Sequence, residues 1–67
     1  MEYAATLPSP ADIRAELARR RWPLYQLAAR ISVHPARLSP MIHERVPMPT
    51  RIAERIAAAL EEEARSA

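Results

Sequence analysis

The fold of this chain is decided by residues 23–44, which read PLYQLAARISVHPARLSPMIHE. Two short patterns of helical period lie here, in residues 24–31 and 35–44, and only residues 32–34 separate them. Their apolar positions are Leu24, Leu27, Ala28, Ile31, Leu38, Met41 and Ile42. Because helices of seven or eight residues are unstable alone, both must share their apolar faces with neighbouring helices. The stretch therefore predicts a helix-turn-helix within a larger helical domain.

Prolines mark where the helices begin, because the first turn of a helix tolerates a residue without an N–H group. Ser9 is placed to cap a first helix that starts at Pro10. Asp12, three residues after this cap, nearly completes a capping box. Pro23 ends the first helix and opens the second, which runs from residue 24 to residue 30 or 31, and Pro35 takes the first position of the third.

The last helix is expected from residue 49 or 50 to about residue 64. Residues 45–49 precede it as a loop, because Pro47 and Pro49 forbid a continuous helix. Its apolar stripe comprises Ile52, Ala53, Ile56, Ala57 and Leu60. No segment has the pattern of a strand. The predicted fold is a small, all-α, four-helix domain over residues 9–64, with or without one short extra turn, and with tails at residues 1–8 and 65–67.

Composition argues against several classes of function. The chain has no cysteine, which excludes disulfides and thiolate metal sites. His34 and His43 lie nine residues apart without a matching carboxylate cluster, so no metal site is expected, and His34 instead occupies a helix-cap position. No glycine-rich phosphate loop is present, and no serine has a base and an acid at suitable spacing. We therefore expect neither an enzyme nor a cofactor, and no small-molecule substrate.

The expected location is the cytoplasm. No apolar run approaches the roughly 20 residues that cross a bilayer, so no membrane partner is expected. Residues 1–8 have neither a basic start nor a long apolar run, so we do not expect them to form a signal peptide.

Positive charge is concentrated in the middle of the chain. The net charge is +2, and all ten basic residues are arginine. Residues 12–51 hold eight arginines and three acidic residues, a net charge of +5. Residues 52–67 carry −2 and residues 1–11 carry −1. A phosphate-facing surface requires such a distribution, so the central region is the candidate contact with nucleic acid.

Residues 27–39 and 48–60, which read LAARISVHPARLS and MPTRIAERIAAAL, resemble the phage-repressor-like (Cro/repressor) helix-turn-helix family. The resemblance extends over about residues 11–60. It implies a lambda-repressor-like fold and a sequence-specific regulator of transcription, a repressor that binds double-stranded DNA as a homodimer. The chain departs from the family pattern at Ser32, where glycine is usual in the turn. It also has Pro23 and Leu24 where the family has Ser or Thr followed by Gln, a phosphate-contacting pair.

The resemblance also implies which side chains meet DNA, with residues 35–44 in the major groove. The implied base contacts are Pro35, Ala36, Arg37, Ser39, Pro40 and His43. Arg37 is the strongest of them, because arginine can pair bidentately with guanine. The implied phosphate contacts are Arg19, Arg20, Arg21, Tyr25, Gln26, Arg45 and Arg51. Pro40 has no N–H for the Ala36 carbonyl, so a kink or a tighter first turn is expected in this helix.

Other interpretations stay open from the residues alone. Arginines at the end of a helix complement its dipole without any ligand, and Arg45 or Arg51 can pair with a nearby glutamate. The apolar positions Pro35, Ala36 and Pro40 also suit a non-enzymatic helical protein-interaction module that keeps the fold without binding DNA. Salt-dependent DNA binding distinguishes this module from a DNA-binding regulator.

Overall fold

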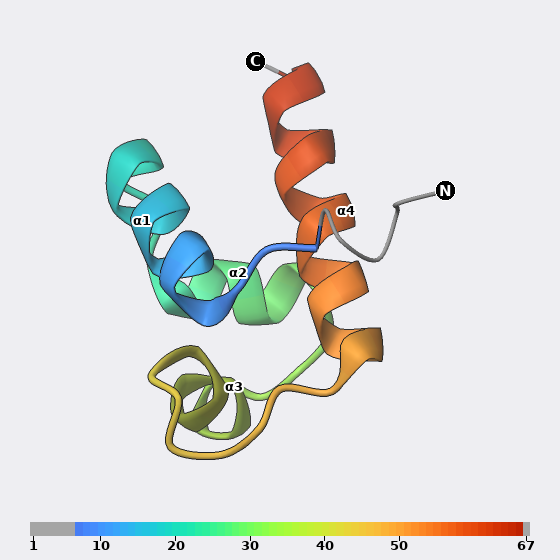
Figure 1. The fold of residues 1–67 in the computed structure, drawn as a ribbon. Coiled ribbons are helices and arrows are strands. Elements are labelled where there is room, and N and C mark those ends of the chain that lie inside the picture. The colour runs from blue at the N-terminus through green and yellow to red at the C-terminus, as the bar shows by residue number, and fades with distance from the viewer. Residues whose placement is uncertain (1–6, 67) are drawn as a thin grey trace.

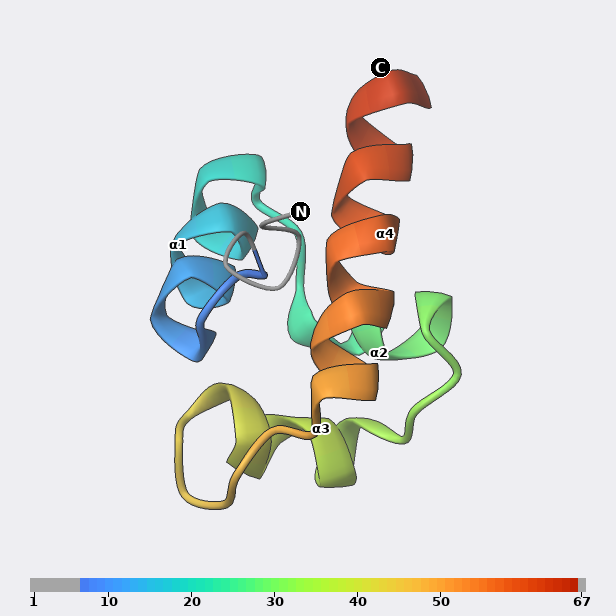
Figure 2. The same ribbon diagram turned by 45° about the vertical axis from the view of Figure 1, so that its right-hand side comes forward.

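The computed structural model describes residues 7–66, and this part of the chain folds into four helices without a strand (Figure 1). The helices are α1 (Pro10–Arg20), α2 (Leu24–Arg30), α3 (Pro35–Ile42) and α4 (Thr50–Ser66). In both views α3 lies at one end of the molecule, and the C-terminal ends of α1 and α4 lie at the other (Figure 1, Figure 2). The predicted all-α, four-helix class is confirmed.

One core joins the four helices. The fully buried large side chains come from every helix: Ile13, Leu27, Leu38, Ile42 and Ile56. Half-buried side chains from the connections and helix starts pack around them, namely Trp22, Leu24, Val33, Met48 and Ile52. Burying one such large aliphatic side chain contributes about 1.5–3 kcal/mol, so this shared core is what stabilises the short α2 and α3.

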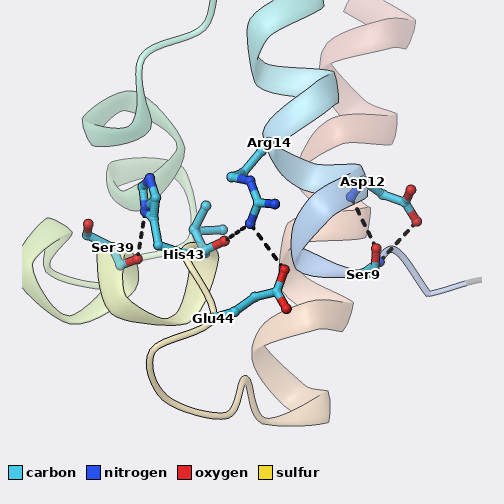
Figure 3. Close-up of polar contacts among 7 residues, drawn as sticks. Ser9, Asp12, Arg14, Ser39, His43 and Glu44 are labelled. Carbon is cyan, nitrogen blue, oxygen red and sulfur yellow. Dashed lines mark hydrogen bonds and ion pairs between the residues drawn. The ribbon is translucent and has the colours of Figure 1, made fainter.

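Side-chain caps fix the starts of α1 and α3. Ser9 Oγ accepts the Asp12 N–H at 3.1 Å, and an Asp12 carboxylate oxygen accepts the Ser9 N–H at 3.2 Å (Figure 3). The capping box at this helix is therefore complete. At α3, His34 Nδ1 accepts the Ala36 N–H at 3.0 Å, which confirms the predicted cap role of His34.

Three helices end on a non-glycine residue in the left-handed conformation. These residues are Arg21 after α1 (φ 54°), Ser32 after α2 (φ 61°) and Glu44 after α3 (φ 61°). In each case the next residue donates its N–H to a carbonyl five positions back, as in Val33 N–H to Ala28 O at 2.9 Å. This is the Schellman motif, which glycine ordinarily completes. A chain without glycine must place side chains at these positions and accept their steric cost.

Two helices differ in length from the prediction. The helix predicted over residues 35–44 ends at Ile42, because Glu44 turns into the left-handed conformation that closes it. The last helix runs through Ser66 rather than ending near residue 64, since neither proline nor glycine interrupts it. In the predicted tail 1–8, Leu7 and Pro8 are half-buried. The other tail positions, residues 1–6 and 67, lie outside the described residues.

Candidate nucleic-acid interface

The outer side of α3 carries the side chains expected to contact bases. Its inner side, Leu38, Met41 and Ile42, is buried in the core. Pro35, Ala36, Arg37 and His43 are exposed, and Ser39 and Pro40 are half-buried. The imidazole of His43 lies against its own helix, with Nδ1 3.1 Å from the Ser39 carbonyl oxygen (Figure 3). Arg37 is the one arginine among the six candidates.

Pro40 is an interior residue of α3, and the helix continues past it to Ile42. Its missing N–H leaves the carbonyl of Ala36 without its usual helical partner. Its own carbonyl closes the helix, since it accepts the N–H of Arg45 at 2.8 Å and that of Val46 at 3.4 Å. Pro40 therefore lies near the end of a short helix. The loss of one backbone hydrogen bond there disturbs the helix less than it would in the middle of a long one.

A groove of about 350 Å³ lies beside the start of α3. It is formed by the α2–α3 connection, by α3 and by the start of α4. Its polar lining is Ser32, His34, Arg37, Arg51 and Arg55, and its apolar lining is Val33, Met41, Pro49 and Ile52. We call this site the arginine groove. It brings together the strongest predicted base contact, Arg37, and a predicted phosphate contact, Arg51.

Three arginines, Arg37, Arg51 and Arg55, line the arginine groove. Arg37 and Arg51 are exposed, and neither guanidinium forms a hydrogen bond or an ion pair with any residue of the described range 7–66. Arg55 donates from Nη1 to the Ile31 carbonyl at 3.3 Å, which fixes its guanidinium at the end of α2. Among the described residues, no acidic side chain lines the groove. The first turn of α4 adds N–H groups without helical partners and the positive end of that helix dipole.

The other phosphate candidates divide between two regions. Arg45 is exposed in the α3–α4 connection and lines a separate shallow pocket with Val46, so it lies outside the arginine groove. Tyr25 and Gln26 are exposed in the first turn of α2, Tyr25 at 62%. The Arg45 side chain forms no hydrogen bond or ion pair with a described residue, so its guanidinium is available to a ligand.

Arg19, Arg20 and Arg21 lie at the C-terminal end of α1, away from α3 (Figure 1, Figure 2). Arg19 and Arg20 both pair with Glu16, and Arg20 also donates to the Leu60 carbonyl at 2.9 Å. The hydrogen bond from Arg19 and the charges of both arginines lower the pKa of the Glu16 carboxyl below its ordinary 4.5. The structure therefore does not bring these three arginines to the arginine groove, and two of them already stabilise the fold.

Arg14 and Arg30 hold helices together through contacts that the sequence did not predict. Arg14 donates from Nη1 to the Ile42 carbonyl at 2.7 Å and lies 3.3 Å from a Glu44 carboxylate oxygen (Figure 3). It thereby joins α1 to the end of α3. Arg30 lies over the Trp22 ring, 5.6 Å from its centroid, and binds Glu62 and Glu63 of α4. These glutamates raise the pKa of Arg30 above its ordinary value, and the hydrogen bond that Arg30 donates to Glu63 contributes most.

Within the described residues, no three His, Asp or Glu side chains gather as metal ligands would. No helix in that range is long and apolar enough to cross a membrane. Comparison with protein-family models, with curated proteins and with solved structures finds no match for this chain. The case for a function therefore rests on the geometry and charge of the arginine groove and on the exposed side of α3.

Proposed function

We propose that this protein is a non-enzymatic, sequence-specific DNA-binding regulator of transcription of the phage-repressor type, with α3 in the major groove. The observation that carries the proposal is the arginine groove. The guanidinium groups of Arg37 and Arg51 have no partner in residues 7–66, yet both residues border one groove at the start of α3. Unpaired cations beside the start of a helix can bind the DNA phosphate backbone. The exposed outer face of a short helix next to them can reach the base edges.

In this proposal Arg37 contacts a base and Arg51 contacts a phosphate. Arg37 lies in the first turn of α3, where a recognition helix reaches base edges, and contacts guanine. Arg51 lies in the first turn of α4 and contacts a phosphate that flanks the site, and Arg45 contacts the next phosphate along. Ala36 and Pro35 offer only methylene and methyl groups, which suit thymine methyls. Few side chains can form hydrogen bonds with base edges, so part of the specificity comes from the shape of the DNA.

A single domain is too small for tight and selective binding, so we propose that it binds as a homodimer. Its largest extent is 27 Å, less than the roughly 34 Å of one turn of DNA. One copy therefore covers one stretch of major groove, and two copies on a two-fold site supply the roughly 1,000–2,500 Å² that specific complexes bury.

The experiment is a selection of bound fragments from a random DNA pool, followed by fluorescence anisotropy on the selected site between 50 and 200 mM salt. Each phosphate contact contributes about −0.9 to the slope of log K against log salt. Replacing Arg51 by Ala should therefore flatten the slope by about 2 in a dimer. Arg37→Ala should instead reduce discrimination at one base pair, at a cost of about 1–3 kcal/mol.

The outer face of α3 also supports a second candidate, a helical protein-interaction module. Pro35 and Ala36 are exposed, and Val46 is 45% exposed in the following connection, so apolar groups border the face that we assign to DNA. A folded protein that binds no DNA from the pool at 50 mM salt would reject the DNA proposal and favour this candidate.

A further inference from the structure

A second groove lies on the side of the molecule formed by α1 and α4. It has a volume of about 650 Å³ and is bordered by the N-terminal segment at Leu7 and Pro8, by α1 and by the middle and end of α4. In Figure 1 the segment that leads into α1 extends from the start of α1 toward α4. We call it the acidic groove, because Asp12, Glu16, Glu54 and Glu61 line it, with Arg20 as its one cation among the described residues.

Two of these carboxylates are already occupied within the fold. Asp12 completes the capping box with Ser9, and Glu16 pairs with Arg19 and Arg20. Arg20 is itself held by Glu16 and the Leu60 carbonyl, so it does not neutralise the rest of the groove.

Glu54 and Glu61 are the carboxylates that remain. Both are exposed, and neither carboxylate forms a hydrogen bond or an ion pair with any residue in the range 7–66. They lie seven residues apart on α4, two helical turns, which places them on one face about 10.5 Å apart along the axis. Two unpaired negative charges at a spacing of two turns match basic side chains seven residues apart on a second helix.

The surface between them is small and apolar. Ala57 is half-buried, Ala58 and Ala64 are exposed, and all three line the groove. Alanines let a second helix approach to the short end of the usual 8–10 Å separation of packed helices. A self-complementary contact between two copies is disfavoured here, because it would bring the same carboxylates of both copies together.

We propose that the acidic groove is a docking site for a basic helical segment of a partner protein. The segment presents arginine or lysine side chains to Glu54 and Glu61 and packs small apolar side chains on Ala57 and Ala58. The site is distinct from the arginine groove in sign and in position. The protein therefore has one surface for a polyanion and another for a polycation, and it can hold both at once.

The test uses a helical 18-residue peptide of alanine, leucine and lysine, with its lysines seven apart along one edge, as the probe for the full chain. A peptide of the same composition with its lysines spread around the helix is the control. We expect the first peptide to bind at least tenfold more tightly in calorimetry at 50 mM salt. Its amide chemical-shift changes should be confined to residues 7–20 and 54–64.

Matched variants separate docking from general attraction. Glu54→Gln with Glu61→Gln should weaken binding of the first peptide at least tenfold. Glu62→Gln with Glu63→Gln removes the same charge from the same helix, beside Arg30 and outside the acidic groove, and should change it less than twofold. Equal weakening by both pairs would overturn the proposal, as would equal binding of the two peptides. All variants are compared by helical circular dichroism, so that loss of fold is not read as loss of binding.

Two other occupants are also tested. If removal of residues 2–6 tightens peptide binding tenfold, the protein's own N-terminal segment occupies the groove and the proposal is wrong. If the free protein sediments as a dimer that Ala58→Arg converts to a monomer, a second copy occupies it, and the proposal is equally wrong.

Discussion

Replacing Ser32 by glycine should stabilise this protein. Ser32 adopts φ 61° in the connection between α2 and α3, where its N–H and that of Val33 close the end of α2. A left-handed backbone costs an L-residue about 1–2 kcal/mol, and glycine avoids that cost. Glycine also has more conformational freedom in the unfolded chain, which reduces the gain in stability by about 0.4–1 kcal/mol. The net gain is about 0.5–1 kcal/mol, or about 2–8 °C in Tm for a domain of this size.

The assay is thermal and urea unfolding followed by circular dichroism, with Ala15→Gly as the matched control. Ala15 is exposed in the middle of α1, where glycine should instead cost about 0.5–1 kcal/mol. The same new residue should thus shift Tm in opposite directions at the two sites. A lower Tm for Ser32→Gly would refute the explanation of how this glycine-free chain ends its helices.

Three further changes test contacts that hold the helices in place. Arg14→Met should cost about 1–2 kcal/mol in urea unfolding, because it leaves the Ile42 carbonyl without its charged donor; an unchanged midpoint would contradict that role. Ser9→Ala should cost about 1 kcal/mol by loss of the capping box, and a cost near zero would show that the cap contributes nothing. Glu16 has a lowered pKa, so its pairing stabilises the fold above the ordinary value of 4.5 and is lost as the pH falls through the lower folded value. Glu16→Gln should therefore flatten the acid limb of the stability profile measured by urea unfolding; a profile identical to that of the unaltered protein would reject this assignment.

The elements of the fold followed from local signals. Prolines and caps at Ser9 and His34 marked helix starts, because these groups act within three residues of their own position. The apolar spacing marked which faces are buried. Helix ends were less accurate, because Glu44 closes α3 with a left-handed residue that no local pattern favours in a charged side chain.

The candidate site was only partly predictable. Arg37 and Arg51 were predicted from the resemblance, as residues of the recognition helix and of the region after the loop that follows it, and the structure brings both to one groove. Arg55 was missed because its position depends on how α4 packs against the end of α2. Arg14 was missed for the same kind of reason, since its partner Ile42 is 28 residues away. The sequence placed Arg19 to Arg21 close to α2 along the chain, whereas the path of α1 carries them to the end opposite α3.

The most direct test of the central claim compares two charge-matched double variants on the selected DNA site. One is Arg37→Ala with Arg51→Ala, at the arginine groove. The other is Arg21→Gly with Arg65→Ala, two exposed arginines that follow α1 and end α4 and have no ion partner in residues 7–66. Fluorescence anisotropy at 100 mM salt should show at least about 30-fold weaker binding for the first, since each lost contact costs about 1–3 kcal/mol, and less than threefold for the second. Equal losses in the two variants, or full binding by the first, would contradict the account.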